Sequence, residues 1–284
     1  MRDFKVNEFT ACPLCELSQK AHESKNVLKK TLTKRWSKSN FVKCNSCGLI
    51  FQNPQEQIEK TDTRYGDDYF KYELDNQENF FSLIKHTLDD FDILKQIPVS
   101  STILEIGSAT GLFLKYMNDN GHKSTGVELC TKSVEYARKN YGVYIINDRL
   151  ENTELEENSF DFIHFSHLIE HLNDPFGFIK KVYSLLKTGG KILITTPNSS
   201  GLFSRYYKDD WRCIVDDHLF LFNKKNLINL LKINGFEVLG IKTWGSIPAG
   251  KGLAQRFNFI KKISDCLVKA VGLGDVVAVY AFKK

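Results

Sequence analysis

The stretch that decides the fold is Leu104-Glu105-Ile106-Gly107-Ser108-Ala109-Thr110-Gly111, at the end of a buried strand predicted over residues 101–107. Its glycines let the backbone turn tightly and approach a ligand with no Cβ in the way. The turn also brings the amino end of a predicted helix, residues 111–121, against that ligand with its amide groups available. Glu128 ends the next strand, 17 residues after Gly111. A carboxylate at that position can accept both hydroxyls of a ribose, so the stretch predicts a nucleotide-binding α/β domain.

Strands and helices alternate outward from this turn, which predicts an α/β fold with a Rossmann-like, seven-stranded, mostly parallel sheet. Thr131 is the expected N-cap of the second helix and Gly142 its end, while Pro175 opens the third. Gly189-Gly190 is expected to turn into the fifth strand. The predicted strands are 101–107, 123–129, 143–147, 159–165, 191–197, 236–244 and 275–283, and the predicted helices are 111–121, 131–142, 176–187 and 224–235.

The charge around the first turn distinguishes between two kinds of nucleotide ligand. A dinucleotide motif has the form G-x-G-x-x-G, but only Gly107 and Gly111 are present here. Glu105 lies two positions before the first glycine, where a carboxylate would repel a pyrophosphate and suit a cationic amino group. S-adenosylmethionine carries an amino group and a sulfonium and no phosphate. The electrostatics therefore favour S-adenosylmethionine as the cofactor.

Four ordered segments resemble the class I S-adenosylmethionine-dependent methyltransferases. LEIGSATGLFL (104–114) resembles motif I of this family, and VEL (127–129) resembles motif II. SFDFIHFSHLIEHLNDP (159–175) is similar to the strand-four motif, and LLKTGGKILITTPN (185–198) to the helix and strand that follow. The resemblance runs from about residue 60 to the end and includes DDHLFLFNKKNLINLLKINGFEVLGI (216–241). One departure is Ala109, which stands where the family usually has its middle glycine.

The resemblance implies a set of cofactor contacts at the carboxyl ends of the strands. Asp148 and Ser166 could equally be ordinary loop residues. The implied contacts are Glu105 at the methionine amino group, Gly107, Ser108 and Gly111 along the methionine moiety, Glu128 at the ribose, Leu129 on the adenine, Asp148 and Leu150 at the adenine edge, and Ser166 and His167 closing the pocket.

The segment His167-Leu168-Ile169-Glu170-His171 holds the titratable groups expected near the transferred methyl. A methyltransferase aligns donor and acceptor and removes a proton where the acceptor is not already anionic. His171 is the candidate base because histidine titrates near neutral pH, with Glu170 beside it. Alternatively, the Glu170-His171 pair only caps and positions the turn, or the pair binds a divalent metal that assists the acceptor. The segment also spells the H-x-x-E-H peptidase pattern, but a strand before it and Asn173-Asp174-Pro175 after it exclude the long helix that pattern requires.

Two further groups of residues are candidates for the acceptor side of the pocket. Trp211, Asp216, Asp217 and His218 lie in the long loop after the fifth strand, where this family usually builds its acceptor site. Tyr65, Tyr69 and Tyr72 precede a helix predicted over 78–97 and are candidates for a lid. Both groups could also be packing or surface residues.

Near the amino end, two C-x-x-C pairs are separated by 28 residues, with Cys12 and Cys15 in the first and Cys44 and Cys47 in the second. This spacing is typical of a structural zinc site with four thiolate ligands. A module this small cannot bury enough core to fold without a metal or another staple. We therefore predict one structural zinc ion, and Gly48 supplies the tight turn of the second pair. The module resembles zinc ribbons fused to small-molecule and to ribosomal RNA methyltransferases, with a role in acceptor binding or in support.

The predicted organisation is a zinc-ribbon module (1–60), a linker with a lid helix (61–100) and a methyltransferase domain (101–284). The chain opens without an apolar leader and has no apolar run of membrane-spanning length, so we expect a cytoplasmic protein. The basic stretch 251–272 could form an amphipathic helix that rests on a membrane or merely packs on the sheet.

The leading functional hypothesis is a methyltransferase of a small-molecule or glycan-precursor acceptor. An RNA methyltransferase that grips nucleic acid with its zinc ribbon is the alternative, but a net charge of +5 is too modest to favour it. A non-catalytic scaffold with the same fold is the third hypothesis, and the intact set of Glu105, Gly107, Gly111 and Glu128 argues against it.

Overall fold

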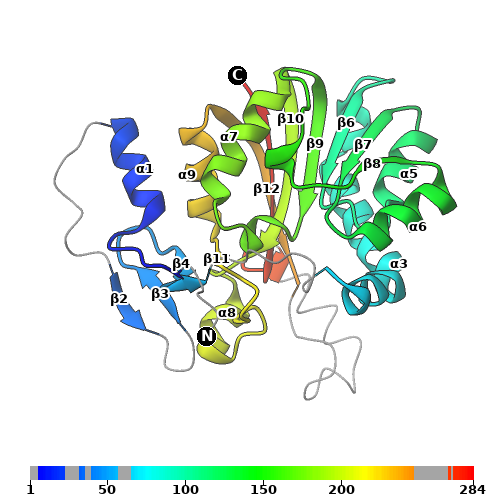
Figure 1. The fold of residues 1–284 in the computed structure, drawn as a ribbon. Helices are drawn as coiled ribbons and strands as arrows, with labels where there is room; N and C mark the ends of the chain where they lie inside the picture. The colour runs from blue at the N-terminus through cyan, green and yellow to red at the C-terminus, as the bar shows by residue number, and fades with distance from the viewer. Residues whose placement is uncertain (1–5, 23–31, 36–39, 57–64, 246–267, 270) are drawn as a thin grey trace.

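The computed structural model describes residues 6–22, 32–35, 40–56, 65–245, 268–269 and 271–284. Its centre is a seven-stranded sheet in which only the last strand, β13, runs antiparallel to its neighbours (Figure 1). The predicted α/β class, strand number and mostly parallel sheet are confirmed. In spatial order the strands are β12 (Phe236–Trp244), β13 (Val276–Lys283), β10 (Leu186–Pro197), β9 (Phe160–Ser166), β6 (Thr102–Ile106), β7 (Lys123–Val127) and β8 (Tyr144–Ile146).

Helices cover both faces of the sheet, as its strands, buried on both sides, require. One apolar core contains Ile103 and Phe162, whereas the residues next to them in the chain, Leu104 and Ile163, belong to the core on the other face. Figure 1 shows α3, α5 and α6 on one side and α7 and α9 on the other. The bounds are α3 (Asp67–Asp90), α4 (Ile93–Gln96), α5 (Leu112–Asp119), α6 (Thr131–Tyr141), α7 (Pro175–Leu185), α8 (Leu202–Tyr207) and α9 (Lys224–Ile233), with single 3₁₀ turns η1 (Leu150–Asn152), η2 (Ile169–His171) and η3 (Lys208–Asp210).

A second, four-stranded sheet lies beside α9 and takes three of its strands from the cysteine module, by which we mean residues 6–56. The module comprises β1 (Val6–Asn7), α1 (Pro13–His22), β2 (Leu32–Arg35), β3 (Phe41–Cys44), β4 (Ile50–Gln52) and β5 (Gln55–Glu56). The fourth strand of this sheet is β11 (Phe220–Leu221), which comes from the loop after β10 and pairs antiparallel with β4. The sequence did not predict this pairing.

Three sequence-based expectations about helices and turns were wrong. The helix expected over 78–97 is α3, which begins at Asp67 because the preceding aromatic residues continue its buried face, and Asp67 and Asp68 suit the positive end of its dipole. Cys130, not Thr131, occupies the N-cap of α6, and the Thr131 hydroxyl instead donates to Asn147 Oδ1 at 2.8 Å. Gly189-Gly190 lies within β10 as an irregularity in its pairing with β9, so the strand begins earlier than expected.

Other boundaries agree with the predictions. Gly142 ends α6 in the left-handed conformation at φ 64°, and Pro175 is the first residue of α7, whose N-cap is Asp174. The helix-bearing insertion expected between the last two strands, and most of the basic stretch 251–272, lie outside the described residues. Within the described ranges, no helix is both long and apolar enough to cross a bilayer.

Candidate active site and cysteine cluster

A cavity of about 1060 Å³ opens at the carboxyl ends of β6, β7, β9 and β10. This is where the strand order of the sheet reverses, between β6 and β9, and open α/β sheets bind their ligands at that position. Nine of the ten predicted cofactor contacts and one of the two predicted catalytic residues line it. The cofactor contacts are Glu105, Gly107, Ser108, Glu128, Leu129, Asp148, Leu150, Ser166 and His167, and the catalytic residue is His171.

His167, the ninth predicted cofactor contact to line the cavity, lies in the adjoining turn between β9 and η2. The remaining two predicted residues lie behind the lining. Gly111 is the N-cap of α5 at φ 80°, and a Cβ there would come within 2.8 Å of the Ala137 Cβ, so this position requires glycine for packing and backbone conformation. Glu170 is fully buried behind His167 and His171.

One part of the site, which we call the cofactor wall, consists of residues 105–111 and 128–129, all of which line the cavity except Gly111. Glu105 is buried in β6, with Oε1 3.3 Å from His164 Nδ1 and with Oε2 lacking a hydrogen-bond partner among the described residues. Burial, and then the charge of Glu128, raise the pKa of Glu105 well above its usual range, while burial lowers the pKa of His164 to about 3. A buried carboxyl oxygen without a partner, at the edge of a cavity, fits a cationic amino group from a ligand.

Glu128 is held in place by three backbone N–H groups. Its Oε2 accepts from Ala109 at 2.9 Å, and its Oε1 accepts from Leu129 and Cys130 at 2.8 Å each. A carboxylate has about four acceptor positions, so these bonds fix the side chain and leave room for a hydroxyl donor from a ligand. Ala109 adopts φ 44°, a left-handed conformation in which a side chain is strained, which explains why a glycine is usual at this position in the family.

The helix α3 forms the outer side of the cavity. Tyr65, Tyr69 and Tyr72 all line it, as the lid hypothesis predicted, and the rings of Tyr65 and Tyr69 meet edge to face at 5.0 Å. Glu73, one helical turn after Tyr69, also lines the cavity, and burial followed by the charge of Glu128 raises its pKa to about 7. Glu73 was not among the residues predicted from the sequence, although its spacing of four residues from Tyr69 places it on the same helix face.

A second group of residues, which we call the acceptor wall, comprises His171, Asp217 and His218, which line the cavity, and Glu170, which is buried beside them. Burial alone would raise the pKa of Glu170, but its hydrogen bond with His167 and the charges of the nearby histidines lower it to about 2. Glu170 Oε1 lies 3.2 Å from His167 Nδ1, and Oε2 accepts from the Thr196 hydroxyl at 3.0 Å. The rings of His171 and His218 meet at 4.7 Å.

Only two of the four loop residues predicted for the acceptor side line the cavity. Asp217 and His218 line the cavity, whereas Asp216 and Trp211 do not. Trp211 is buried in a small core with Phe41 and Leu221, and its Nε1 donates to Asp275 Oδ2 at 3.3 Å. The packing alternative is therefore correct for Trp211.

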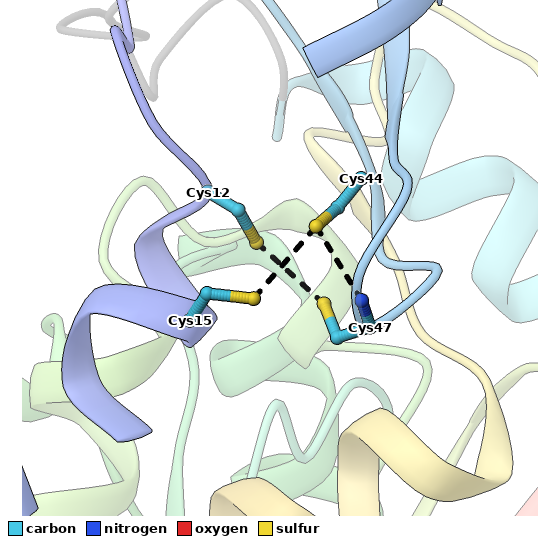
Figure 2. A group of neighbouring side chains, drawn as sticks. All are labelled: Cys12, Cys15, Cys44 and Cys47. Atoms are coloured by element: carbon cyan, nitrogen blue, oxygen red, sulfur yellow. Dashed lines mark hydrogen bonds between the residues drawn. The ribbon is translucent and has the colours of Figure 1, made fainter. Parts of the chain in front are cut away.

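The four predicted metal-binding cysteines come together in the cysteine module (Figure 2). Cys12 Sγ lies 3.6 Å from Cys47 Sγ, and Cys15 Sγ lies 3.7 Å from Cys44 Sγ. Four thiolates placed tetrahedrally at the usual Zn–S distance of about 2.3 Å have sulfur atoms about 3.8 Å apart, so the cluster fits a zinc ion. Gly48 turns at φ 76° and its N–H donates to the Cys44 carbonyl at 2.9 Å, which confirms the tight turn after the second pair.

The cysteine module is joined directly to the acceptor wall. The Gln52 side chain donates to the carbonyls of Asp216 at 2.8 Å and His218 at 3.0 Å, and the Gln52 N–H donates to the Leu219 carbonyl at 2.9 Å. The Leu219 N–H in turn donates to the Glu170 carbonyl at 2.7 Å. A continuous chain of hydrogen bonds thus links β4 of the module to both halves of the acceptor wall.

Comparison with known proteins agrees with this geometry. A family model described as a methyltransferase domain matches residues 77–241, which is more than half of the chain. An uncharacterised protein of Methanocaldococcus jannaschii is 27% identical over 78% of this chain and 97% of its own length. The ubiquinone biosynthesis O-methyltransferase of Xanthomonas axonopodis is 31% identical, but the match spans only 36% of this chain and 45% of that enzyme.

Among solved structures, an S-adenosylmethionine-dependent methyltransferase from Archaeoglobus fulgidus shares the fold, with a TM-score of 0.55 and 21% identity. The similarity covers 76% of this chain and all of that protein. This similarity shows the shared fold, and the match to the family model shows the family. The chain belongs to the class I S-adenosylmethionine-dependent methyltransferase family.

Proposed function

We propose that the protein transfers a methyl group from S-adenosylmethionine to an oxygen atom of a small-molecule acceptor, free or as part of a glycan precursor. The charge of the cavity carries this proposal. Its lining includes seven acidic residues and only two basic ones, which are Glu73, Glu105, Glu128, Asp148, Glu151, Asp174 and Asp217 against Arg149 and Arg212. An acidic lining suits the cationic methyl donor and disfavours the negatively charged phosphodiester backbone of RNA.

The size of the cavity supports a small acceptor. At about 1060 Å³ it slightly exceeds the range of about 300–1,000 Å³ that is usual for small-molecule sites, so it can hold a cofactor together with a second small ligand. The cofactor wall and the acceptor wall contribute different residues to the lining of this one space. The arrangement therefore suits the alignment of two ligands, which is the main requirement of methyl transfer.

The proposed cofactor contacts are those of the sequence analysis. Glu105 receives the amino group on its buried Oε2, Glu128 receives a ribose hydroxyl, and the remaining lining residues surround the methionine and adenine parts. When bound, the cofactor supplies the methyl: the acceptor oxygen forms a bond to the methyl carbon, the carbon–sulfur bond breaks with both electrons going to sulfur, and the acceptor proton passes to water. The O-methyltransferase named above supports oxygen as the accepting atom.

The cysteine module is part of a zinc-ribbon domain proposed to span residues 1–60, and it binds one structural zinc ion through Cys12, Cys15, Cys44 and Cys47. Its proposed role is to hold the acceptor wall, because Gln52 and β4 bind the segment that carries His218. The segment 61–100 contributes the α3 side of the cavity, and residues 101–284 form the catalytic domain.

A transfer assay tests the proposal. The purified chain is supplied with labelled S-adenosylmethionine and panels of hydroxylated small molecules, sugar derivatives and RNA, and the release of S-adenosylhomocysteine is measured. We expect turnover with a hydroxylated small molecule and none with RNA. Turnover with RNA alone, weakened by added salt, would contradict the proposed acceptor class.

A further inference from the structure

Three side chains of the acceptor wall have the composition of a metal site distinct from the cysteine cluster. Glu170, His171 and His218 each offer one ligand atom, and these atoms lie within 4.8 Å of one another. Glu170 and His171 come from η2, whereas His218 precedes β11, 47 residues along the chain from His171. The three side chains thus come together from two separate segments of the chain.

Both histidine rings are oriented for metal binding by a backbone carbonyl. His171 Nδ1 lies 2.8 Å from the Asp217 carbonyl oxygen, and His218 Nδ1 lies 2.8 Å from the Cys213 carbonyl oxygen. A carbonyl oxygen only accepts hydrogen bonds, so Nδ1 carries the hydrogen in each ring and Nε2 carries the lone pair. Metal-binding histidines are fixed in this way, with the second ring nitrogen donating to a carbonyl or carboxylate.

The third ligand is a carboxylate that is buried and also oriented. Glu170 is fully buried, with the Thr196 hydroxyl donating to Oε2 at 3.0 Å and His167 Nδ1 at 3.2 Å from Oε1. A buried carboxylate is stable when it is paired with a positive charge as well as hydrogen bonded. No lysine or arginine is paired with Glu170 among the described residues. A divalent cation would supply this charge.

The cluster faces the cavity on one side only. His171, His218 and Asp217 line the cavity, whereas Glu170 is fully buried and does not line it. A cation held by two imidazoles and one carboxylate keeps coordination positions open, and here these positions point into the space for the acceptor. Such a cation would bind an oxygen atom and lower the pKa of its hydroxyl.

We propose that Glu170, His171 and His218 bind one divalent transition-metal cation that holds a hydroxyl oxygen of the acceptor at the acceptor wall of the cavity. The inference rests on the proposed function for the identity of the oxygen ligand, but the cation site itself does not. The donor set of two nitrogens and one oxygen selects Mn²⁺, Fe²⁺, Co²⁺ or Zn²⁺ over Mg²⁺, which prefers an all-oxygen shell.

Cobalt binding tests the site with metal alone. The chain is purified with zinc retained in the cysteine cluster, and Co²⁺ is added while its visible absorption is recorded. We expect one Co²⁺ per chain with the spectrum of nitrogen and oxygen ligands and without the intense thiolate charge-transfer band. His171→Ala and His218→Ala each should weaken Co²⁺ binding at least about 10-fold, in line with the loss of one ligand.

A matched control is His86→Ala, since His86 is exposed on α3 and does not line the cavity. It should bind Co²⁺ like the native chain. S-adenosylmethionine binding, measured by calorimetry on each variant, reports whether the fold is intact independently of the cation. Absence of Co²⁺ uptake by the natively folded chain, or equal uptake by the native, His171→Ala and His218→Ala chains, would overturn the proposal.

Metal removal tests the role of the cation in transfer. Chelation that leaves the cysteine-bound zinc in place should reduce turnover at least about 100-fold by misplacing the acceptor, and added Mn²⁺ or Co²⁺ should restore it. Cofactor affinity should not change. Full turnover without the second cation would refute its role, and loss of cofactor binding in the native chain would instead refute the proposed function.

Discussion

The two walls of the cavity are built in different ways. The cofactor wall comes from two neighbouring strands and the turns that follow them, and Glu128 is fixed by the backbone of residues within 19 positions of it. The acceptor wall joins η2 to a segment more than 40 residues further on, and that segment is held in turn by β4 of the cysteine module. The first wall is therefore a property of the parallel sheet, and the second depends on a separate module.

This difference predicts that damage to the module impairs the acceptor site and spares the cofactor site. The largest effect is expected from Cys44→Ser. Structural zinc binding contributes about 10–16 kcal/mol to the folding of small modules, so losing one thiolate should release the metal and loosen β4. Transfer should fall at least about 100-fold because the acceptor is misplaced. Cofactor affinity, measured by calorimetry, should change by less than about threefold. Full activity in a zinc-free variant would show that the acceptor wall does not depend on the cysteine module.

The second prediction concerns pH and the cofactor wall alone. The raised pKa of Glu105 means that the free protein keeps a proton on this carboxyl above the ordinary carboxyl pKa. A cationic amino group lowers that pKa, so cofactor binding releases the proton, and affinity rises with pH by up to about tenfold per unit until the raised pKa is passed. Calorimetry in buffers of different ionisation enthalpy measures the protons released. If Glu105→Gln released the same number of protons on cofactor binding as the native chain, Glu105 would be excluded as their source.

A smaller effect is expected from Gln52→Ala, which removes two hydrogen bonds from module to acceptor wall and leaves the zinc ligands intact. Because the bonds are neutral and partly exposed, about 1 kcal/mol should be lost, which corresponds to about a fivefold rise in the KM for the acceptor. The cofactor Kd should not change. Gln96→Ala is the matched control, since Gln96 contacts the Phe91 carbonyl away from the cavity. If both variants had the same KM for the acceptor, the hydrogen bonds of Gln52 would not contribute to acceptor binding.

The smallest effect concerns strain in the cofactor wall. Ala109→Gly removes the side chain from a residue at φ 44°, which relieves about 1–2 kcal/mol and is partly offset by the greater freedom of glycine in the unfolded chain. We expect Tm to rise by about 1–3 °C. Ala137→Gly, in the buried face of α6, should instead lower Tm by a similar amount. A decrease for Ala109→Gly would show that its conformation is not strained.

The cofactor wall could be predicted from the sequence because its residues are contiguous and each has a conformational reason. Gly111 must be left-handed and tightly packed, and Glu105 and Glu128 end adjacent strands. The four cysteines were predictable because each C-x-x-C pair is a short pattern that can be recognised in the sequence. In both cases the signal is local.

The acceptor wall was only partly predictable. His171 and His218 were each candidates, but their meeting depends on the pairing of β11 with β4, and a two-residue strand leaves no periodicity to detect. Glu73 was missed because the helix was expected to begin at residue 78, whereas the aromatic and acidic residues before that position belong to α3. The meeting of the two histidines and the start of α3 both depend on tertiary contacts, which the local sequence does not reveal.

The most direct test of the account is titration of the native chain with S-adenosylmethionine in a calorimeter, in parallel with Glu105→Ala. The account predicts one cofactor bound per native chain and an affinity at least about 10-fold weaker in the variant, since a charged hydrogen bond is worth about 1.5–3 kcal/mol. Absence of binding to the native chain, or equal affinity in the two proteins, would contradict the assignment of the cofactor wall.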